Sequence, residues 1–384
     1  MINMCLHPVK LFYNRKTGKY QINYMPNECS KTNVVYAPCR KCEGCKHDRE
    51  GEFILRMKHE IESYKGNATF LTLTVNEENM ENVFPGRELS HRPFQLFMKR
   101  LRKLLPSKVT YVMCGEYGAK KNRPHYHAII FGWRPQPEEL RVVKRTPGYN
   151  LYTCSTIEKC WKFGFNTVGV ANESSSRYLM KYVLKQLGIE KELFSIDDET
   201  GEVVNYKRPY IVYPRSKQNG GLGFRWFERN KEKIFTQGYI AGSRAEIHLS
   251  IPKYYKRKCE ELYPELYQEW KKNMVERIME DTVEFAEKNG LLVRPENVLI
   301  GKFPEAFSKL ENAMVSAHEI LKDKESWKKK GGFTQRLELE RMAYYLTQEA
   351  VTEVRISQER IRLENRKAKE NIRNMKNIYG KEEL

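Results

Sequence analysis

Two histidines separated by one residue begin an apolar run in NRPHYHAIIFG, residues 122–132. In a β-strand, residues i and i+2 point to the same face, so His125 and His127 would stand side by side while Tyr126 turns away. Two imidazoles in this relation form half of a site for a divalent cation. A hairpin would bring Glu116, near the end of a preceding apolar run, close to both rings. Two histidines and one carboxylate leave coordination positions open for water and substrate, as a catalytic metal site requires.

The stretch RYLMKYVLKQ carries a second pattern with possible chemistry. Tyr178, Lys181, Tyr182 and Lys185 are spaced i, i+3, i+4 and i+7, which places them within about 100° of one another on a helix. A tyrosine hydroxyl, with a pKa of about 10, is a poor nucleophile unless it is activated. A neighbouring ammonium group favours the phenolate and stabilises charge on a phosphate. Two tyrosines one turn apart could each attack one metal-bound phosphate.

Bland alternatives stand beside both patterns. The histidines could be incidental surface or core residues, and an H-x-H pair without Glu116 would favour that interpretation. The tyrosine–lysine face could be an ordinary solvated face, because the helix has an apolar face of its own on the opposite side. That face is formed by Leu179, Met180, Val183, Leu184 and Leu187.

Three of the nine cysteines lie in CRKCEGC, where the C-x-x-C spacing occurs twice. Cys39, Cys42 and Cys45 at these intervals are typical of a zinc site whose fourth ligand comes from elsewhere. The candidates for that fourth ligand are Cys5, His7 and Cys29. An iron–sulfur cluster or three buried thiols on a turn are the alternatives.

Composition narrows the class of protein. Sixty-eight basic residues against 49 acidic ones give a net charge of +19 and a pI near 9.4, which favours a polyanionic partner, most simply nucleic acid. A mean hydropathy of −0.70 indicates a protein with a wide polar surface. The chain shows no signal-peptide pattern and no apolar run of the ~20 residues that a membrane span needs. The odd number of cysteines favours reduced thiols over a disulfide framework.

Elements able to position these residues follow from the periodicity of the sequence. TFLTLTV alternates as a strand does, with Leu71, Leu73 and Val75 on one face. A serine is available to cap the helix that carries the tyrosines, and Gly188 to end it. The expected elements are a helix at 48–64, a strand at 69–75, a helix at 92–105, strands at 109–116, 125–132 and 164–170, and a helix at 174–188. Because about eight residues join the strands at 109–116 and 125–132, they should form an antiparallel hairpin. The predicted fold class is α+β, an antiparallel sheet with flanking helices.

Several motifs in this order resemble the rolling-circle replication initiators of the HUH endonuclease superfamily. RPHYHAIIFG supplies the histidine–hydrophobic–histidine motif, FLTLTV resembles the first motif, and RYLMKYVLK resembles the two-tyrosine motif. PCRKCEGCK, GEYG followed by RPHYHA, GFNTVGV and GGLGFRWFERNKEKIF resemble segments of the initiators of microviruses, especially gokushovirus-like single-stranded DNA phages. The resemblance covers about residues 1–260.

The resemblance implies a fold, an activity and a set of roles. The sheet would be of RNA-recognition-motif type. Mg²⁺ or Mn²⁺ would be held by Glu116, His125 and His127, while Tyr178 or Tyr182 nicks origin DNA, single-stranded or supercoiled, and becomes linked to its 5′ phosphate. The free 3′ hydroxyl would prime a host polymerase, and the second tyrosine would allow the strand to be re-joined. Lys181 and Lys185 would position or charge-balance the phosphate. Host polymerase and helicase would be partners in the cytoplasm of the infected bacterium, with no membrane involved.

The expected domains are a Cys-rich segment at 1–47, an HUH endonuclease core at 48–190, a mixed DNA-binding region at 191–325 and a charged helical tail at 326–384. Basic stretches at 215–231 and 253–258 include aromatic residues, as surfaces that bind single strands do. The tail, with neither glycine nor proline from Phe333 to Tyr379, would form one or two long helices, either solvated or partner-binding. The competing hypothesis for the whole chain is a non-enzymatic, zinc-containing nucleic-acid-binding protein.

Overall fold

A computed structural model describes residues 5–118, 123–146, 149–187, 193–196, 203–206, 211–212, 220–242, 248–294 and 332–379. The chain divides into two compact units, one of residues 1–49 and 268–384 and the other of residues 50–267. This division groups the N-terminal residues with the C-terminal ones, whereas the domain boundaries expected from the sequence follow the chain in order. Among the described residues, no helix combines the length and the apolar character needed to cross a membrane.

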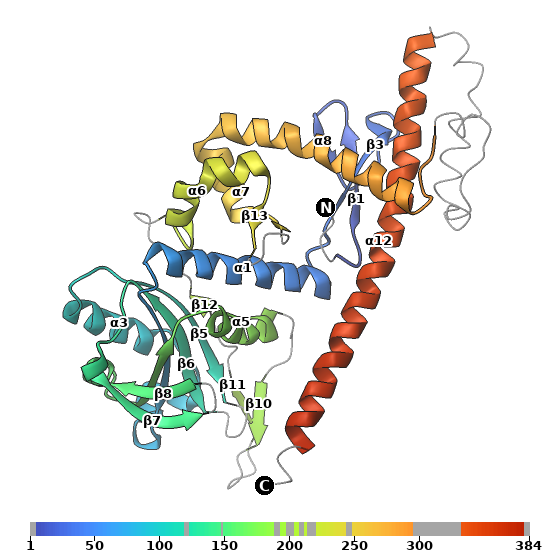
Figure 1. Ribbon diagram of the computed structural model, residues 1–384. Helices are drawn as coiled ribbons and strands as arrows, with labels where there is room; N and C mark the ends of the chain where they lie inside the picture. Colours follow the sequence, from blue (N-terminus) through green and yellow to red (C-terminus); the bar gives the residue numbers. More distant parts are fainter. Residues whose placement is uncertain are drawn as a thin grey trace. The chain divides into compact units, whose positions relative to one another are not determined.

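A seven-stranded antiparallel sheet organises the described part of unit 50–267, with the order β12-β5-β6-β4-β9-β8-β7 (Figure 1). Its strands are β4 Ala68–Val75, β5 Thr110–Tyr117, β6 Pro124–Phe131, β7 Leu140–Thr146, β8 Tyr149–Cys154, β9 Gly164–Val170 and β12 Ile211–Val212. Each pair of neighbours is antiparallel. The predicted α+β class and the hairpin of the strands at 109–116 and 125–132 are therefore confirmed. The likeness to an RNA-recognition motif stays a prediction.

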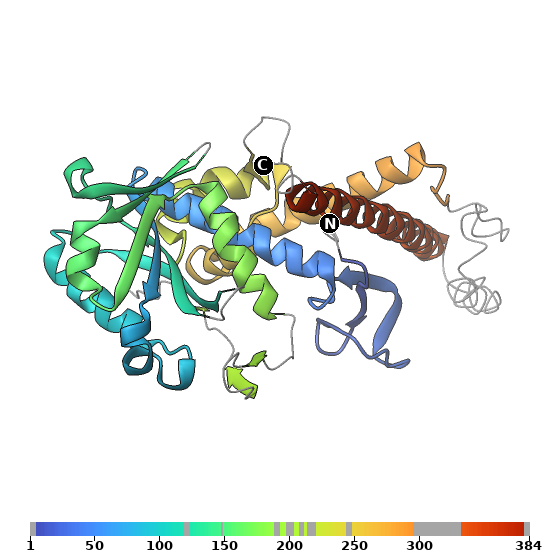
Figure 2. The ribbon, with the colours of Figure 1, turned by 90° about the horizontal axis from the view of Figure 1, so that it is seen from below.

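Helices cover both faces of this sheet, as the views in Figures 1 and 2 show. One face packs on α3 and α4, through a core that includes Leu71, Phe97 and Trp161. The other face packs on α1 and α5, through Met57 and Leu179 among others. The helices are α1 Glu43–Ser63, α2 Met80–Val83, α3 Arg92–Leu104, α4 Ser155–Cys160 and α5 Glu173–Leu187, with 3-10 turns η1 Glu77–Asn79, η2 Pro85–Arg87 and η3 Pro137–Glu139.

Burial in β4 follows the alternation of its sequence. Leu71, Leu73 and Val75 are fully buried, while Phe70, Thr72 and Thr74 are partly exposed on the opposite face. The expected division of this strand into two faces is confirmed. β4 lies between β6 and β9 in the sheet, so its second face lies directly beside the strand that carries the histidines.

Two local predictions need correction. The N-terminus of α5 is capped by Asn172 and not by a serine: the amide of Ser175 donates to Asn172 Oδ1 at 3.0 Å, and Ser175 Oγ accepts from the Asn172 amide at 2.8 Å. The stretch before residue 160, which carried no expected element, forms β7, β8 and α4. Val142 and Val143 are 49% and 60% exposed. β7 therefore lacks the buried face that would give a strand its alternating pattern.

The segment from Gly220 to Leu262 packs its aromatic residues inside the protein. It forms α6 Phe224–Gln237 and α7 Lys253–Leu262, with a short ribbon of β13 Ile240–Ala241 and β14 His248–Leu249; a second ribbon pairs β10 Leu193–Ile196 with β11 Val203–Tyr206. Phe227 and Tyr255 are fully buried, and the ring of Trp226 stacks on His59 of α1 at 3.5 Å. The prediction that these aromatic side chains form a base-stacking surface is wrong for these three. They are the packed faces of two amphipathic helices whose basic residues lie elsewhere on each helix. Residues 213–219 of the first basic stretch lie outside the described residues.

One glycine of this segment has a backbone that other residues rarely adopt. Gly223 precedes α6 with φ at 79°, and a Cβ there would lie 2.3 Å from Tyr255 Oη. Its amide donates to Glu60 Oε2 at 2.6 Å, which joins the segment to α1.

The other unit contains a three-stranded sheet of order β2-β1-β3, with β1 Val9–Asn14, β2 Lys19–Gln21 and β3 Cys29–Ala37. Its long helices are the greater part of α8 Pro264–Lys288 and all of α12 Gly332–Tyr379, a single helix of 48 residues. Met342, Leu346 and Val351 of α12 are buried in a core shared with Val34 and Ala286. This part of the tail is therefore a core helix of its own chain, in place of the solvated or partner-binding helix expected from its charge.

Candidate active site

The β5–β6 hairpin brings together the three residues expected to hold a cation. Glu116 of β5 and His125 of β6 are direct partners across the hairpin, and His127 lies opposite Cys114. The Gly118 amide donates to the Arg123 carbonyl at 3.0 Å and closes the turn region. One ligand atom from each of Glu116, His125 and His127 lies within 4.8 Å of the others.

Both imidazoles contact the same carboxylate oxygen. His125 Nε2 lies 2.6 Å and His127 Nε2 3.1 Å from Glu116 Oε1. His125 Nδ1 lies 3.0 Å from the Arg123 carbonyl, which can only accept, so this nitrogen carries a proton. In a neutral His125 ring, the lone pair of Nε2 then faces a carboxylate oxygen. Two acceptors at that distance need a cation or a second proton between them, so the donor set fits a bound metal ion.

The protonation of this cluster favours metal binding. Burial raises the pKa of Glu116, but hydrogen bonds from His125 and His127 outweigh it and hold the pKa below its ordinary value. Burial lowers the pKa of His127, which is 3% exposed. An ionised carboxylate and a neutral imidazole are the forms that bind cations.

His127 is fixed in place by a residue that the sequence analysis did not single out. Thr72 of β4 is its partner across the β4–β6 pair, and Thr72 Oγ1 lies 2.9 Å from His127 Nδ1. Hydrogen bonds of this kind orient a ligand histidine and set its tautomer. The polar face of TFLTLTV was the available signal, but which of its threonines meets a histidine depends on the strand register.

Tyr178 of α5 lies beside His127. The two rings meet edge to face, with centroids 5.4 Å apart and planes at 85°. Phe70 of β4 contacts both rings, at 5.9 Å from His127 and 5.8 Å from Tyr178, and was also not singled out. Tyr178 is 44% exposed, so its phenol can be reached from solvent while its ring is held against the histidine.

The other three residues expected on this helix cannot be placed as side chains. The backbone of α5 extends to Leu187, so Lys181, Tyr182 and Lys185 belong to the same helix as Tyr178. Their side chains lie outside the described residues, and their roles stay predictions.

The four cysteines of the candidate zinc site also come together. Cys5 joins Cys39, Cys42 and Cys45, with all four Sγ atoms within 4.8 Å of one another. Of the three candidates for the fourth position, Cys5 is the one in the cluster. His7 is exposed. Cys29 Sγ accepts instead from Gln21 Nε2 at 3.3 Å.

Comparison with known proteins places the candidate active site inside a family. The sequence model of the replication-associated protein ORF2 family matches residues 68–187, from the start of β4 to the end of α5. Glu116, His125, His127 and Tyr178 all lie in the matched range. No solved structure was found to match the chain significantly.

Three curated relatives share the description. The replication-associated protein ORF2 of Spiroplasma virus 4 is 28% identical over 295 residues, which cover 73% of this chain and 88% of the relative. The replication-associated protein VP4 of Bdellovibrio phage phiMH2K is 29% identical over 278 residues, or 69% of this chain and 80% of the relative. The replication-associated protein ORF4 of Chlamydia phage 1 is 30% identical over 165 residues, 41% of this chain and 40% of the relative. The resemblance to phage replication proteins drawn from the sequence is confirmed, and through residues 68–187 the chain belongs to the replication-associated protein ORF2 family.

Proposed function

We propose that this protein is a metal-dependent endonuclease and strand transferase that starts rolling-circle replication by nicking origin DNA. The observation that carries the proposal is the position of Tyr178, whose partly exposed ring packs on His127, one of three side chains with the donor set of a catalytic metal site. A net charge of +19 suits a polyanionic substrate.

Glu116, His125 and His127 would hold Mg²⁺ or Mn²⁺. Imidazole and carboxylate ligands together accept several divalent ions, and three protein ligands leave positions for water and phosphate oxygens. When bound, the ion supplies Lewis-acid polarisation of the phosphate. The protein's own contribution is to hold the imidazoles in one orientation, through Thr72 and the Arg123 carbonyl, and to keep the carboxylate ionised.

In the proposed step, Tyr178 Oη attacks the phosphorus of the scissile phosphodiester. A bond from the phenol oxygen to phosphorus forms, and the bond from phosphorus to the 3′ oxygen breaks. The phenol loses its proton, and the departing 3′ oxygen gains one to become a free hydroxyl. The product is a 5′-phosphotyrosine link beside a 3′ end that can prime synthesis. Tyr182 would repeat the attack on a later origin copy so that the strand can be re-joined, while Lys181 and Lys185 would balance charge on the phosphate.

The test is capture of the covalent intermediate. The full-length protein is incubated with Mn²⁺ and a library of randomised single-stranded oligonucleotides, and adducts that survive denaturing electrophoresis are recovered and sequenced. We expect an adduct whose tyrosine mass spectrometry identifies as residue 178 or 182. Y178F should reduce the adduct strongly, and Y178F/Y182F should abolish it.

Tyr126→Phe is the matched control for these variants. Tyr126 lies between the two histidines in the chain, but its ring is buried on the opposite face of the sheet, where its hydroxyl donates to the Ser90 carbonyl. This variant should keep the adduct at temperatures below its unfolding transition. DNA binding without any adduct in the wild-type protein would instead support a non-enzymatic nucleic-acid-binding protein.

A further inference from the structure

The four-cysteine cluster belongs to the unit of residues 1–49 and 268–384, and the nicking reaction proposed above makes no use of it. Its Sγ atoms are spaced as the corners of one small polyhedron. Cys39 Sγ and Cys45 Sγ are 3.9 Å apart, as are Cys42 Sγ and Cys5 Sγ, and no pair exceeds 4.8 Å. A tetrahedron whose metal–sulfur bonds are about 2.3 Å long has edges of about 3.8 Å. A disulfide would need its two sulfurs at about 2.05 Å, and all four cysteines are free.

Backbone amides are aimed at these sulfurs. Leu6 N donates to Cys42 Sγ at 3.3 Å, Cys39 N to Cys5 Sγ at 3.2 Å, and Cys42 N to Cys39 Sγ at 3.4 Å. Two of the bonds run between the N-terminal segment and the C-x-x-C turn, so the two segments hold each other's sulfurs. An amide that donates to sulfur stabilises the thiolate, which is the form that binds metal.

The turn itself has an uncommon backbone. Arg40, directly after Cys39, has φ at 64°, a left-handed conformation that costs energy for a residue with a Cβ. The turn keeps this conformation with Cys39 and Cys42 both directed into the cluster. A bond from each thiolate to one ion would offset the cost.

The cluster lies at one end of the β2-β1-β3 sheet. The last paired residues of β1 and β3 at this end are Val9 and Ala37. Cys5 precedes the first by four residues, and Cys39 follows the second by two. A metal bound by both sides would therefore clip together the ends of two paired strands and the beginning of α1.

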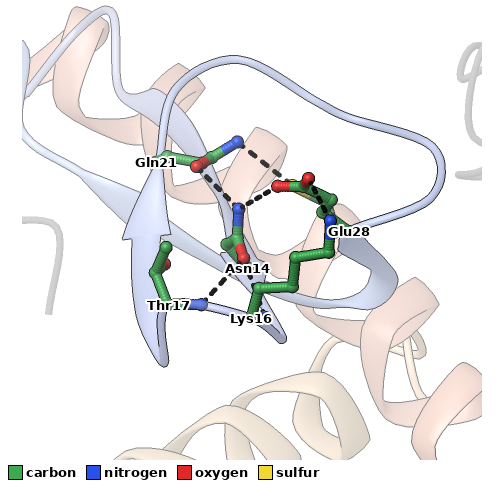
Figure 3. Close-up of polar contacts among 6 residues, drawn as sticks. Asn14, Lys16, Thr17, Gln21 and Glu28 are labelled. Carbon is green, nitrogen blue, oxygen red and sulfur yellow. Dashed lines mark hydrogen bonds and ion pairs between the residues drawn. The ribbon is translucent and has the colours of Figure 1, made fainter.

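The opposite end of the sheet is closed by hydrogen bonds (Figure 3). Buried Asn14 donates from Nδ2 to Gln21 Oε1 at 3.1 Å and to Glu28 Oε2 at 3.0 Å. Its Oδ1 accepts from the amides of Lys16 and Thr17. The polar network therefore satisfies one end of the sheet without a metal. The other end offers four thiols in its place.

We propose that Cys5, Cys39, Cys42 and Cys45 bind one structural Zn²⁺ ion in an all-thiolate site. Four protein ligands fill a tetrahedron and leave no position for substrate, as in structural zinc sites. Two of the four thiols, those of Cys5 and Cys45, are buried. A cluster of several irons would need its cysteines spread around a larger inorganic core, so the short Sγ separations favour a single ion.

The experiment measures the metal content of the full-length protein. Purified wild-type protein should carry about one zinc per chain by elemental mass spectrometry after dialysis against EDTA, because structural zinc binds tightly. C39S/C42S should lose that zinc. Cys29→Ser is the matched control: this buried cysteine of the same sheet accepts from Gln21, lies outside the cluster and should leave zinc content unchanged. H125A/H127A should also keep the zinc, which separates this site from the proposed catalytic one.

Cobalt substitution serves if the cysteine variant does not fold. Wild-type protein produced with Co²⁺ should show the intense visible bands of tetrahedral cobalt and a sulfur-to-cobalt charge-transfer band in the near ultraviolet. Wild-type protein without zinc, iron in place of zinc, or a cobalt spectrum without the thiolate band would each overturn the proposal. A failure of the nicking assay would leave these measurements untouched.

Discussion

Two groups of side chains in this protein can each hold a metal ion, and they differ in how completely protein atoms surround that ion. Glu116, His125 and His127 provide three ligands of mixed chemistry next to a tyrosine that is 44% exposed. The cysteine cluster provides four sulfurs, with backbone amides directed at them. Three ligands and an open side allow exchange with substrate, whereas four ligands hold an ion for stability. The comparison teaches that one chain can separate the chemistry of cutting DNA from the task of holding its N-terminal sheet together.

The largest effect expected from this contrast is the loss of nicking when the open site is destroyed. H125A/H127A should lower the rate of adduct formation by on the order of 10³-fold, because Lewis-acid catalysis contributes several kcal/mol. The melting temperature and zinc content should change little. The measurement is a time course of adduct formation with Mn²⁺ beside a thermal melt.

His91→Gln controls for the general cost of replacing a histidine in the same unit. His91 lies at the start of α3 and contributes nothing to the cation site. Its variant should form the adduct at the wild-type rate. Equal rates for wild type and H125A/H127A would refute the catalytic role of the histidine pair.

Acid should disturb both sites, since imidazoles and thiolates release metal when they are protonated, but a metal-independent group responds in the same range. His59 is 3% exposed, stacks on Trp226 and lies 2.9 Å through Nδ1 from Tyr255 Oη. Burial and the nearby charge of Lys58 lower the pKa of His59 from 6.5 to about 3. The unfolded chain therefore binds a proton below pH 6.5 that the folded protein refuses down to pH of about 3.

The consequence is a loss of stability as the pH falls, and none as it rises above neutrality. Between pH 7 and pH 4 the free energy of unfolding should drop by on the order of 2–3 kcal/mol from this residue, at about 1.4 kcal/mol for each pKa unit. Urea unfolding of the EDTA-treated protein at several pH values measures it. In His59→Gln that part of the pH slope should vanish, even though the variant is less stable at neutral pH. An unchanged slope would show that other groups carry the acid response.

What could be predicted from the sequence is what depends on short-range periodicity. The alternation in β4, the shared face of His125 and His127, and the hairpin that brings in Glu116 all follow from spacings of a few residues. Cys5 was one of three possible fourth ligands, because 34 residues separate it from Cys39 and no local pattern measures that closure.

The strands that sequence reasoning missed lack a buried face. In β7 the valines are exposed, so hydrophobic alternation gives no signal. The aromatic residues of α6 and α7 show the opposite error. Phe227 and Tyr255 stand among basic residues in the sequence, yet each is buried, because an amphipathic helix mixes the two types within every turn.

The smallest expected effect concerns Thr72, which was missed because its contact depends on the register of β4 against β6. Thr72→Val keeps the shape of the side chain and removes the hydroxyl that lies 2.9 Å from His127 Nδ1. Loss of a hydrogen bond that orients a ligand histidine weakens metal binding by about 10- to 100-fold. The Mn²⁺ concentration for half-maximal adduct formation should rise by that factor, while the rate at saturating Mn²⁺ should fall less.

Thr74→Val is the matched control, because Thr74 lies on the same face of β4 and opposite His125, whose Nδ1 is satisfied by the Arg123 carbonyl. A hydroxyl at position 74 is therefore not needed to orient either ring, and the half-maximal Mn²⁺ concentration should stay at the wild-type value. If both variants shift it equally, the threonines act through general packing of the strand. If Thr72→Val alone shifts it, and zinc content stays constant, then the open site depends on a hydroxyl outside its three ligands. The cysteine site would have its counterpart in the amides of Leu6 and Cys39, which belong to the backbone and cannot be removed by changing a side chain.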